Sequence, residues 1–101
     1  MDWVWTWGGT SFGYFDGDDL WTYEGKHVGR RDGDEIYDRN GRYLGEVMSE
    51  NRLIRNDSKA AYVSSAFAPY GSRGAHANYA NYAGFAMYAG HSGFPGPDEF
   101  S

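Results

Sequence analysis

Two acidic turns and three histidines are the residues of this chain most able to do chemistry. Residues 16–19 and 32–35 surround a glycine with carboxylates, and such oxygen ligands suit calcium. Neither turn has the spacing and closing glutamate of a calcium-binding loop, which favours solvated turn carboxylates. The histidines show neither metal-ligand nor catalytic-triad spacing: His27, His76 and His91. The sequence therefore predicts a protein that is not an enzyme, with no catalytic residue, no metal site and no cofactor.

Aromatic residues make up 19% of the chain and are the second chemically suggestive group. Five of them could form a stacking surface for sugar rings or a peptide: Trp5, Trp7, Trp21, Tyr23 and Tyr37. The competing interpretation places these rings in the core of a small domain that has few aliphatic residues. Because large aromatic side chains dominate core burial, the core interpretation is favoured.

Composition and charge exclude several kinds of partner. The net charge is −5, from 9 basic and 14 acidic residues, so we expect no nucleic-acid binding. No apolar run approaches membrane-spanning length, so no membrane partner is expected. Cysteine is absent, which rules out disulfides and thiolate metal sites. No signal peptide follows Met1, and the cytoplasm is the default expectation.

A sixteen-residue period runs without gaps through residues 4–65 and predicts the elements that position these side chains. The period links Gly9, Gly25, Gly41 and Asp57; Phe12, Val28, Leu44 and Ala60; and Gly13, Gly29, Gly45 and Ala61. Each unit has the pattern of a β-hairpin, with a two-residue turn such as Asn40-Gly41 between its strands. Asn-Gly favours a type I′ turn, which needs positive φ at both central residues. The sequence thus predicts four tandem hairpins in a β domain of residues 1–65.

The small residue in the second strand of each unit suggests how the hairpins are arranged. A strand disfavours glycine unless another backbone comes close. Four such positions at one period are expected to be equivalent in a closed, pseudo-four-fold, all-β ring, which also removes exposed strand edges. The alternative is an open meander whose glycines merely adjoin turns.

The pattern Ile36-Tyr37, Asn40-Gly41 and Leu44-Gly45, repeated four times before a tail with spaced tyrosines, resembles the four-fold β-flower family. The resemblance implies a small bacterial repeat protein, without an assigned activity and with no catalytic residue to transfer. The fourth unit departs from the pattern at Arg52, Asp57 and Ala60.

Residues 66–101 form a tail that follows a different rule. From Ser65 to Phe94 the chain reads in triplets, with a small residue first and an aromatic residue, His or Arg third. A strict period of three is typical of an extended polyproline II segment. An α-helix over residues 77–89 and plain disorder are the alternatives. The rings expected to make the tail's contacts are Tyr79, Tyr82, Phe85 and Tyr88.

The length of the tail limits where its rings can lie. As a straight polyproline II segment it would extend about 90 Å, far beyond a small β domain, and would leave its rings in water. The tail therefore either folds back over its own domain or packs between chains, and its length slightly favours packing between chains. These features predict a non-enzymatic structural or protein-interaction module that self-assembles through its tail as a homo-oligomer or binds another protein. The alternative is a small lectin-like module that binds carbohydrate in pockets between units.

Overall fold

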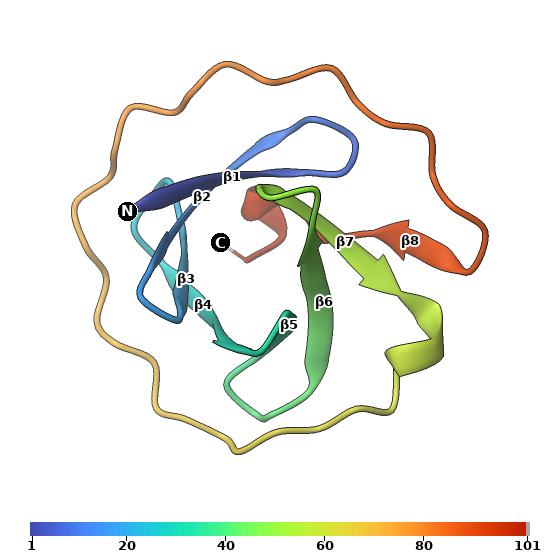
Figure 1. Ribbon diagram of the computed structural model, residues 1–101. Helices are drawn as coiled ribbons and strands as arrows, with labels where there is room; N and C mark the ends of the chain where they lie inside the picture. Colours follow the sequence, from blue (N-terminus) through green and yellow to red (C-terminus); the bar gives the residue numbers. More distant parts are fainter. Residues whose placement is uncertain (101) are drawn as a thin grey trace.

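Short runs of alternating apolar residues form seven consecutive strands, each joined to the next by a tight turn. The computed structural model describes residues 1–100. The strands are β1 (Asp2–Thr6), β2 (Ser11–Asp16), β3 (Asp19–Thr22), β4 (His27–Asp32), β5 (Glu35–Tyr37), β6 (Tyr43–Met48) and β7 (Arg52–Asn56). Successive strands pair antiparallel, and β1 also pairs parallel with β7 through Trp5 and Arg52. This pairing closes the sheet and confirms the predicted closed all-β arrangement, a mixed barrel of seven strands (Figure 1).

The hairpin turns differ from the predicted type I′ turns. In the first hairpin the Thr6 N–H donates to the Thr10 carbonyl oxygen (2.8 Å), and the Gly9 N–H donates to the Thr6 carbonyl oxygen (2.9 Å). Only the third loop residue has a positive φ, which is +96° at Gly9, +95° at Gly25 and +81° at Gly41. The turns are therefore three-residue loops that end in a left-handed glycine. The predicted type I′ turn was wrong because this loop requires a positive φ, and hence glycine, at its third residue only.

A β-bulge interrupts the first strand of the first three hairpins. The pairing register shifts between Val4 and Trp5, between Leu20 and Trp21, and between Ile36 and Tyr37. Bulges bend a strand and increase its twist, which a narrow barrel requires. The residue before each bulge lies in the apolar interior, and the residue after it is buried on the outer side of the barrel.

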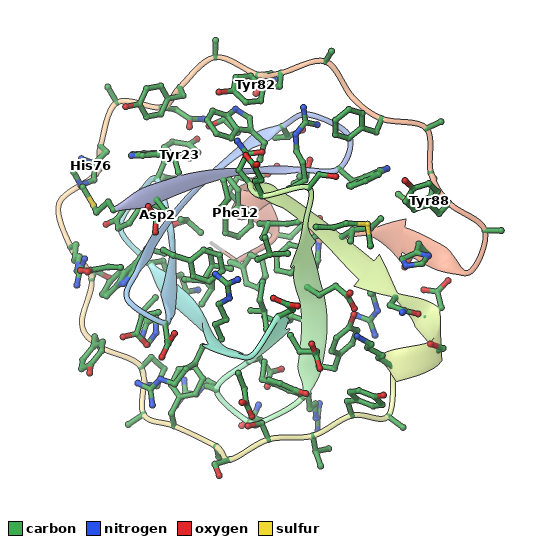
Figure 2. All side chains as sticks on the ribbon, viewed as in Figure 1. Asp2, Phe12, Tyr23, His76, Tyr82 and Tyr88 are labelled. Atoms are coloured by element: carbon green, nitrogen blue, oxygen red, sulfur yellow. The ribbon has the colours of Figure 1, made fainter. Side chains whose placement is uncertain are left out.

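Aliphatic residues and phenylalanines fill the barrel interior: Val4, Phe12, Phe15, Leu20, Val28, Ile36, Leu53 and Phe94. Phe94 follows β8 (His91–Gly93), and its ring centroid lies 5.5 Å from that of Phe12. The 3₁₀ helix η2 (Pro97–Phe100) places a second ring 5.8 Å from Phe12. Figure 1 shows this segment at the centre of the barrel, and Figure 2 shows Phe12 close to it. Residues 94–100 thus plug the barrel.

The small residues that were expected to be equivalent lie at crowded points, with one exception. A Cβ at Gly13 would lie 2.0 Å from the Trp21 carbonyl oxygen, and one at Gly45 would lie 2.5 Å from the Phe94 ring. A Cβ at Gly29 would meet a methyl group of Ile36 at 2.9 Å. Ala61, the expected fourth member, is exposed in a turn. The crowding therefore comes from the neighbouring strand and the plug.

The second strand predicted for the fourth hairpin, with Ala60-Ala61, does not form. The 3₁₀ helix η1 (Asp57–Lys59) follows β7 instead, and the Asn56 side chain caps it by accepting the Ser58 N–H (3.1 Å). β8 pairs antiparallel with β7. The prediction was wrong because Ala60, at the position of Phe12, Val28 and Leu44 in the other units, offers little apolar surface to bury. A strand from the tail, β8, pairs with β7 instead.

Residues 64–90, which we call the strap, encircle the barrel before β8 (Figure 1). Residues 64–88 have no regular secondary structure, so the helical alternative for residues 77–89 is wrong. The strap folds back over its own barrel, which is the first of the two arrangements considered for the tail. The molecule is a flattened disc with extents of 37 × 33 × 21 Å. Within residues 1–100, no helix is long and apolar enough to cross a membrane.

Candidate functional site

The strap is held to the hairpin turns by a repeating set of backbone hydrogen bonds. The Ser64, Arg73 and Tyr82 N–H groups donate to the carbonyl oxygens of Gly41, Gly25 and Gly9 at 2.8–2.9 Å. Three residues further along the strap, Phe67, His76 and Phe85 donate in the same way to Arg39, Tyr23 and Trp7. Each hairpin of sixteen residues is therefore matched by nine residues of strap, which is three triplets.

The turn glycines are the points where the strap comes closest. A Cβ on Gly9, Gly25 or Gly41 would lie 2.1 Å from a strap carbonyl oxygen. All three also have a positive φ, which L-residues rarely adopt. At the corresponding fourth position, Asp57, the contact is reversed: the Asp57 N–H donates to the carbonyl oxygen of Gly90, the last residue of the strap. The loss of glycine in the fourth unit thus coincides with a different hydrogen bond between the turn and the strap.

The small first residues of the triplets turn their carbonyl oxygens towards the barrel. The Trp5 and Trp7 indole N–H groups donate to the carbonyl oxygens of Ala80 (2.9 Å) and Ala86 (3.0 Å). Between them, the Arg52 guanidinium donates to the Ala83 carbonyl oxygen at 2.9 Å. These acceptors are three residues apart. The three-residue period of the sequence therefore matches the spacing of the strap carbonyl oxygens that accept hydrogen bonds from barrel side chains.

Arg52 explains why the fourth unit lacks an apolar residue at this position. The side chain is buried at the parallel β1–β7 seam. Its charge faces the Phe85 ring, with 4.2 Å from Cζ to the ring centroid, and the Tyr82 ring at 5.4 Å. Carbonyl oxygens and aromatic faces thus compensate a buried guanidinium. Arg52 therefore lies on the strand pair that closes the barrel and also binds the strap. In the sequence, the only sign of this role was the departure of Arg52 from the repeat pattern.

The structure brings together most of the ring residues that the sequence singled out. Trp5 stacks on Tyr82 with centroids 3.8 Å apart and contacts Tyr79 at 6.1 Å. Trp7 contacts Phe85 at 4.9 Å and Tyr88 at 5.3 Å. We call Tyr79, Tyr82, Phe85 and Tyr88 the aromatic arc; Figure 2 labels two of its members.

The other predicted ring residues lie away from the arc. Trp21 is buried against His27 and Tyr70, and the Arg73 guanidinium lies 3.8 Å above its ring. Tyr37 is buried and pairs with Tyr43 at 6.2 Å. Tyr23 gives its carbonyl oxygen to the strap. The predicted stacking surface is therefore largely covered by the chain's own strap.

His27 connects the strap to the second hairpin, although the sequence offered no partner for it. Its Nδ1 accepts the Tyr70 N–H (3.0 Å), while Nε2 faces Asp19 Oδ1 (2.9 Å) and the Gly29 carbonyl oxygen (3.1 Å). These partners require a neutral ring with its proton on Nε2. Burial lowers the pKa of His27, although the neighbouring Asp19 carboxylate raises it.

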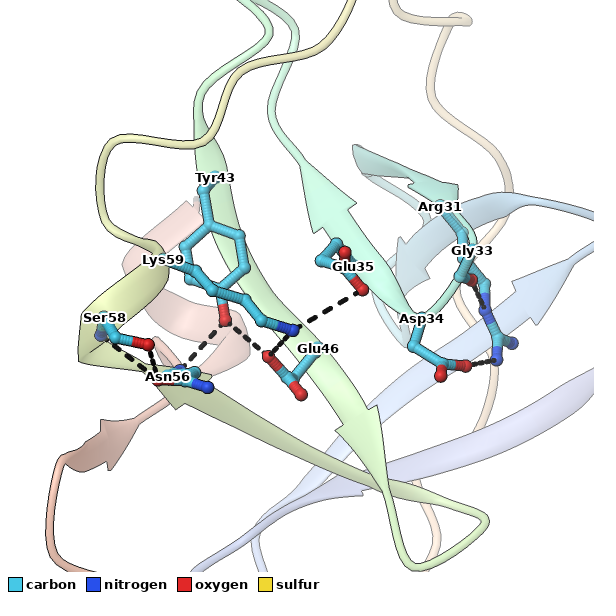
Figure 3. A network of polar contacts seen from close by, with 9 residues as sticks. All are labelled: Arg31, Gly33, Asp34, Glu35, Tyr43, Glu46, Asn56, Ser58 and Lys59. Carbon is cyan, nitrogen blue, oxygen red and sulfur yellow. Dashed lines mark hydrogen bonds and ion pairs between the residues drawn. The ribbon is translucent and has the colours of Figure 1, made fainter.

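A polar network fixes η1 beneath the start of the strap (Figure 3). The Tyr43 hydroxyl donates to Glu46 Oε1 (3.0 Å) and accepts the Asn56 N–H (2.9 Å). The Lys59 ammonium lies 3.0 Å from Glu46 Oε1, and this hydrogen bond raises the pKa of Lys59. Burial raises the pKa of Tyr43. Glu46 on β6 thus binds both the Tyr43 hydroxyl and the ammonium of Lys59, which belongs to η1. The network therefore attaches η1 to the barrel.

No group of three or more His, Cys, Asp or Glu side chains within residues 1–100 is placed to hold a metal ion.

The fold and the aromatic contacts together define a small closed β-barrel that is wrapped by its own polypeptide. The family model of the 4-fold beta flower protein matches residues 1–83, and the chain belongs to that family. The match covers the barrel and most of the strap. No curated protein matches the chain, and no solved structure does.

Proposed function

We propose that this chain is a non-enzymatic protein-interaction module whose contact surface is the aromatic arc, with self-association through the strap as the primary case. The observation that carries the proposal is the half-exposure of every ring in the arc. Tyr79, Tyr82, Phe85 and Tyr88 are 55%, 47%, 49% and 53% exposed, although each packs on a barrel tryptophan. One face of each ring is thus held, and the other is open to a partner.

The fixed position of these rings favours recognition. Tyrosines and tryptophans are enriched among the residues that contribute most to protein–protein affinity. Rings that are already held in place lose little conformational entropy when they bind, because the barrel has ordered them beforehand. Contiguous exposed apolar surface on a soluble protein commonly marks an interaction site. The lectin-like alternative is less favoured because the strap covers Trp5 and Trp21.

We propose further that the barrel consists of four copies of one hairpin unit about a pseudo-four-fold axis. The first three units support this through equivalent bulges, equivalent glycine turns and equivalent strap contacts. In the fourth unit, β8 substitutes for the second strand. Repetition of this kind gives a small protein a scaffold for one continuous ring of contacts.

Analytical ultracentrifugation of the full chain, at concentrations up to about 1 mM, tests the interaction proposal because association with a Kd of about 1 mM is then visible. We expect concentration-dependent dimers or larger species. The double variant Tyr79→Ser, Tyr88→Ser should weaken association at least about tenfold, which corresponds to about 1.4 kcal/mol. Tyr62→Ser removes a ring of similar exposure outside the arc and should leave association unchanged. A monomer throughout the range, or equal effects of the two changes, would contradict self-association through the arc.

A further inference from the structure

A pocket of ≈ 460 Å³ lies between the second and third hairpins, under the strap. Its volume is within the usual range of small-molecule sites, about 300–1,000 Å³. Val28, Leu44, Pro69 and Phe100 give it apolar walls, and the Tyr70 ring adds an aromatic face. The pocket is separate from the aromatic arc, which lies over the first hairpin and the barrel seam.

The chain itself shows how this space can be filled. The corresponding positions of the preceding hairpin lie sixteen residues earlier in the barrel and nine later in the strap. There Phe12 stands in place of Val28, and Asn78 and Asn81 stand in place of Pro69 and Ser72.

Both asparagines bond to Ser11, with Asn78 Oδ1 accepting from Oγ (2.6 Å) and Asn81 Oδ1 from the backbone N–H (2.9 Å). Larger side chains and direct hydrogen bonds therefore occupy the first interface. In the second interface His27 takes the place of Ser11, and its Nδ1 accepts the Tyr70 N–H (3.0 Å). Space remains beside it because Val28, Pro69 and Ser72 are smaller than their counterparts in the first interface.

The strap is also seated differently over the pocket. Trp5 donates its indole N–H to the Ala80 carbonyl oxygen, and the corresponding pair nine residues earlier on the strap would be Trp21 and Gly71. The Trp21 N–H is instead buried without a hydrogen-bond partner within residues 1–100. Gly71 lines the pocket. The contact that closes the first interface is thus missing where the pocket opens.

The charge available in the pocket is positive. Asp38 Oδ1 already accepts the backbone N–H groups of Asn40 (2.9 Å) and Arg42 (3.0 Å), so it serves the turn. The Lys26 ammonium donates to the Phe100 carbonyl oxygen. Arg39 is an exposed residue that lines the pocket, and its guanidinium is in none of the ion pairs within residues 1–100. In a chain with a net charge of −5, a free guanidinium beside apolar walls favours an anionic ligand.

We propose that this pocket binds a small amphipathic carboxylate, such as an aryl-substituted or branched-chain acid. The apolar body of the ligand lies on Val28, Leu44 and Phe100, and the Tyr70 ring covers it. The carboxylate pairs with the Arg39 guanidinium, whose planar fork suits two parallel hydrogen bonds.

Titration of the full ¹⁵N-labelled chain with phenylacetate, phenylacetamide and acetate tests the proposal. Phenylacetate should shift the amide resonances of Arg39, Tyr70 and Gly71, with a Kd of about 1 mM for a probe of this size. Phenylacetamide has the same shape without the charge and should bind about tenfold more weakly. Acetate lacks the apolar body and should leave these resonances unchanged.

Three variants separate the parts of the proposal. Arg39→Gln should reduce phenylacetate binding about tenfold and leave phenylacetamide binding unchanged. Arg42→Gln makes the same charge change in the same hairpin outside the pocket and should have no effect. Ser72→Asn copies the filled interface on the exposed strap and should abolish binding of both aromatic probes.

Two results would overturn the proposal. Absence of shifts at Arg39, Tyr70 and Gly71 with phenylacetate at about 10 mM would exclude the site, because that concentration is about ten times the expected Kd. Equal affinity for phenylacetate and phenylacetamide would exclude the carboxylate assignment.

Discussion

At the residue scale, Gly9, Gly25 and Gly41 meet two requirements at once. Each closes a three-residue loop with a positive φ, and each lets a strap carbonyl oxygen come within 2.1 Å of where a Cβ would lie. Backbone strain and steric exclusion are separate costs. The chain offers a way to separate them, because Gly17 and Gly33 have a positive φ but nothing within 4 Å of a built Cβ.

Gly25→Ala is predicted to destabilise the protein by about 3 kcal/mol, the sum of left-handed strain and a displaced strap. Gly17→Ala should cost only the strain, about 1 kcal/mol. Urea unfolding of both variants, followed by tryptophan fluorescence, measures the difference. Equal losses of stability would mean that the strap does not depend on the absence of a side chain at this turn.

At the element scale, the hairpins and the strap show which parts of the fold could be predicted from the sequence. The sixteen-residue period predicted the first three hairpins, because the turn glycines and the alternating apolar residues specify strands locally. The turn type was missed, since Asn40-Gly41 fits both a two-residue and a three-residue loop. The replacement of Ala60-Ala61 by β8 depends on pairing between distant segments, which no local pattern records.

The candidate site was predictable in its parts but not in its pairing. The sequence identified Trp5 and Trp7 on one side and Tyr82 and Phe85 on the other as residues expected to make contacts. It did not indicate that they contact each other, because a three-residue period in the tail and a sixteen-residue period in the barrel do not fix how the two segments are aligned. Arg52 and His27 were missed as strap contacts for the same reason.

The His27 contact makes strap attachment depend on pH. Burial lowers the pKa of His27 in the folded protein, so the unfolded chain takes up the proton first as pH falls below about 6.5. This contribution to stability is present above about pH 6.5 and is lost as pH falls towards the folded pKa. Protonation of Nδ1 also removes the acceptor for the Tyr70 N–H. Asp19 opposes the shift and Arg30 adds to it.

Hydrogen exchange of the Tyr70 amide, corrected for its intrinsic pH dependence, measures this effect. Protection should fall between pH 7 and pH 5, while the Tyr82 amide, which donates to Gly9, should keep its protection. In His27→Gln the pH-dependent part of the change at Tyr70 should disappear, since glutamine does not titrate. A wild-type-like pH response in that variant would assign the effect to another group.

At the scale of the whole molecule, residues 94–100 hold the centre of a disc whose rim is the strap. Phe94 lies in the interior cluster and against Gly45. The barrel is too narrow to collapse around the space that a missing ring would leave, because its strands are fixed by pairing on both sides. We therefore expect the barrel and the tail to unfold as one cooperative unit.

Phe94→Ala is predicted to lower the free energy of unfolding by about 3–5 kcal/mol, the usual cost of removing a buried phenylalanine ring. Phe85→Ala makes the same chemical change at a half-exposed ring of the strap and should cost about 1 kcal/mol. Thermal and urea unfolding of both variants provide the comparison. Similar losses would show that the central plug contributes no more than a surface contact.

The nine-to-sixteen match between strap and barrel constrains how the gene can change length. A single triplet deleted from the strap would shift every later contact away from its turn, whereas nine residues correspond to one whole hairpin. An inserted or lost hairpin must therefore be accompanied by nine strap residues gained or lost elsewhere in the coding sequence. The lengths of these two distant segments are therefore expected to change together. A homologue with another number of hairpins should have a strap that is longer or shorter by nine residues for each hairpin gained or lost.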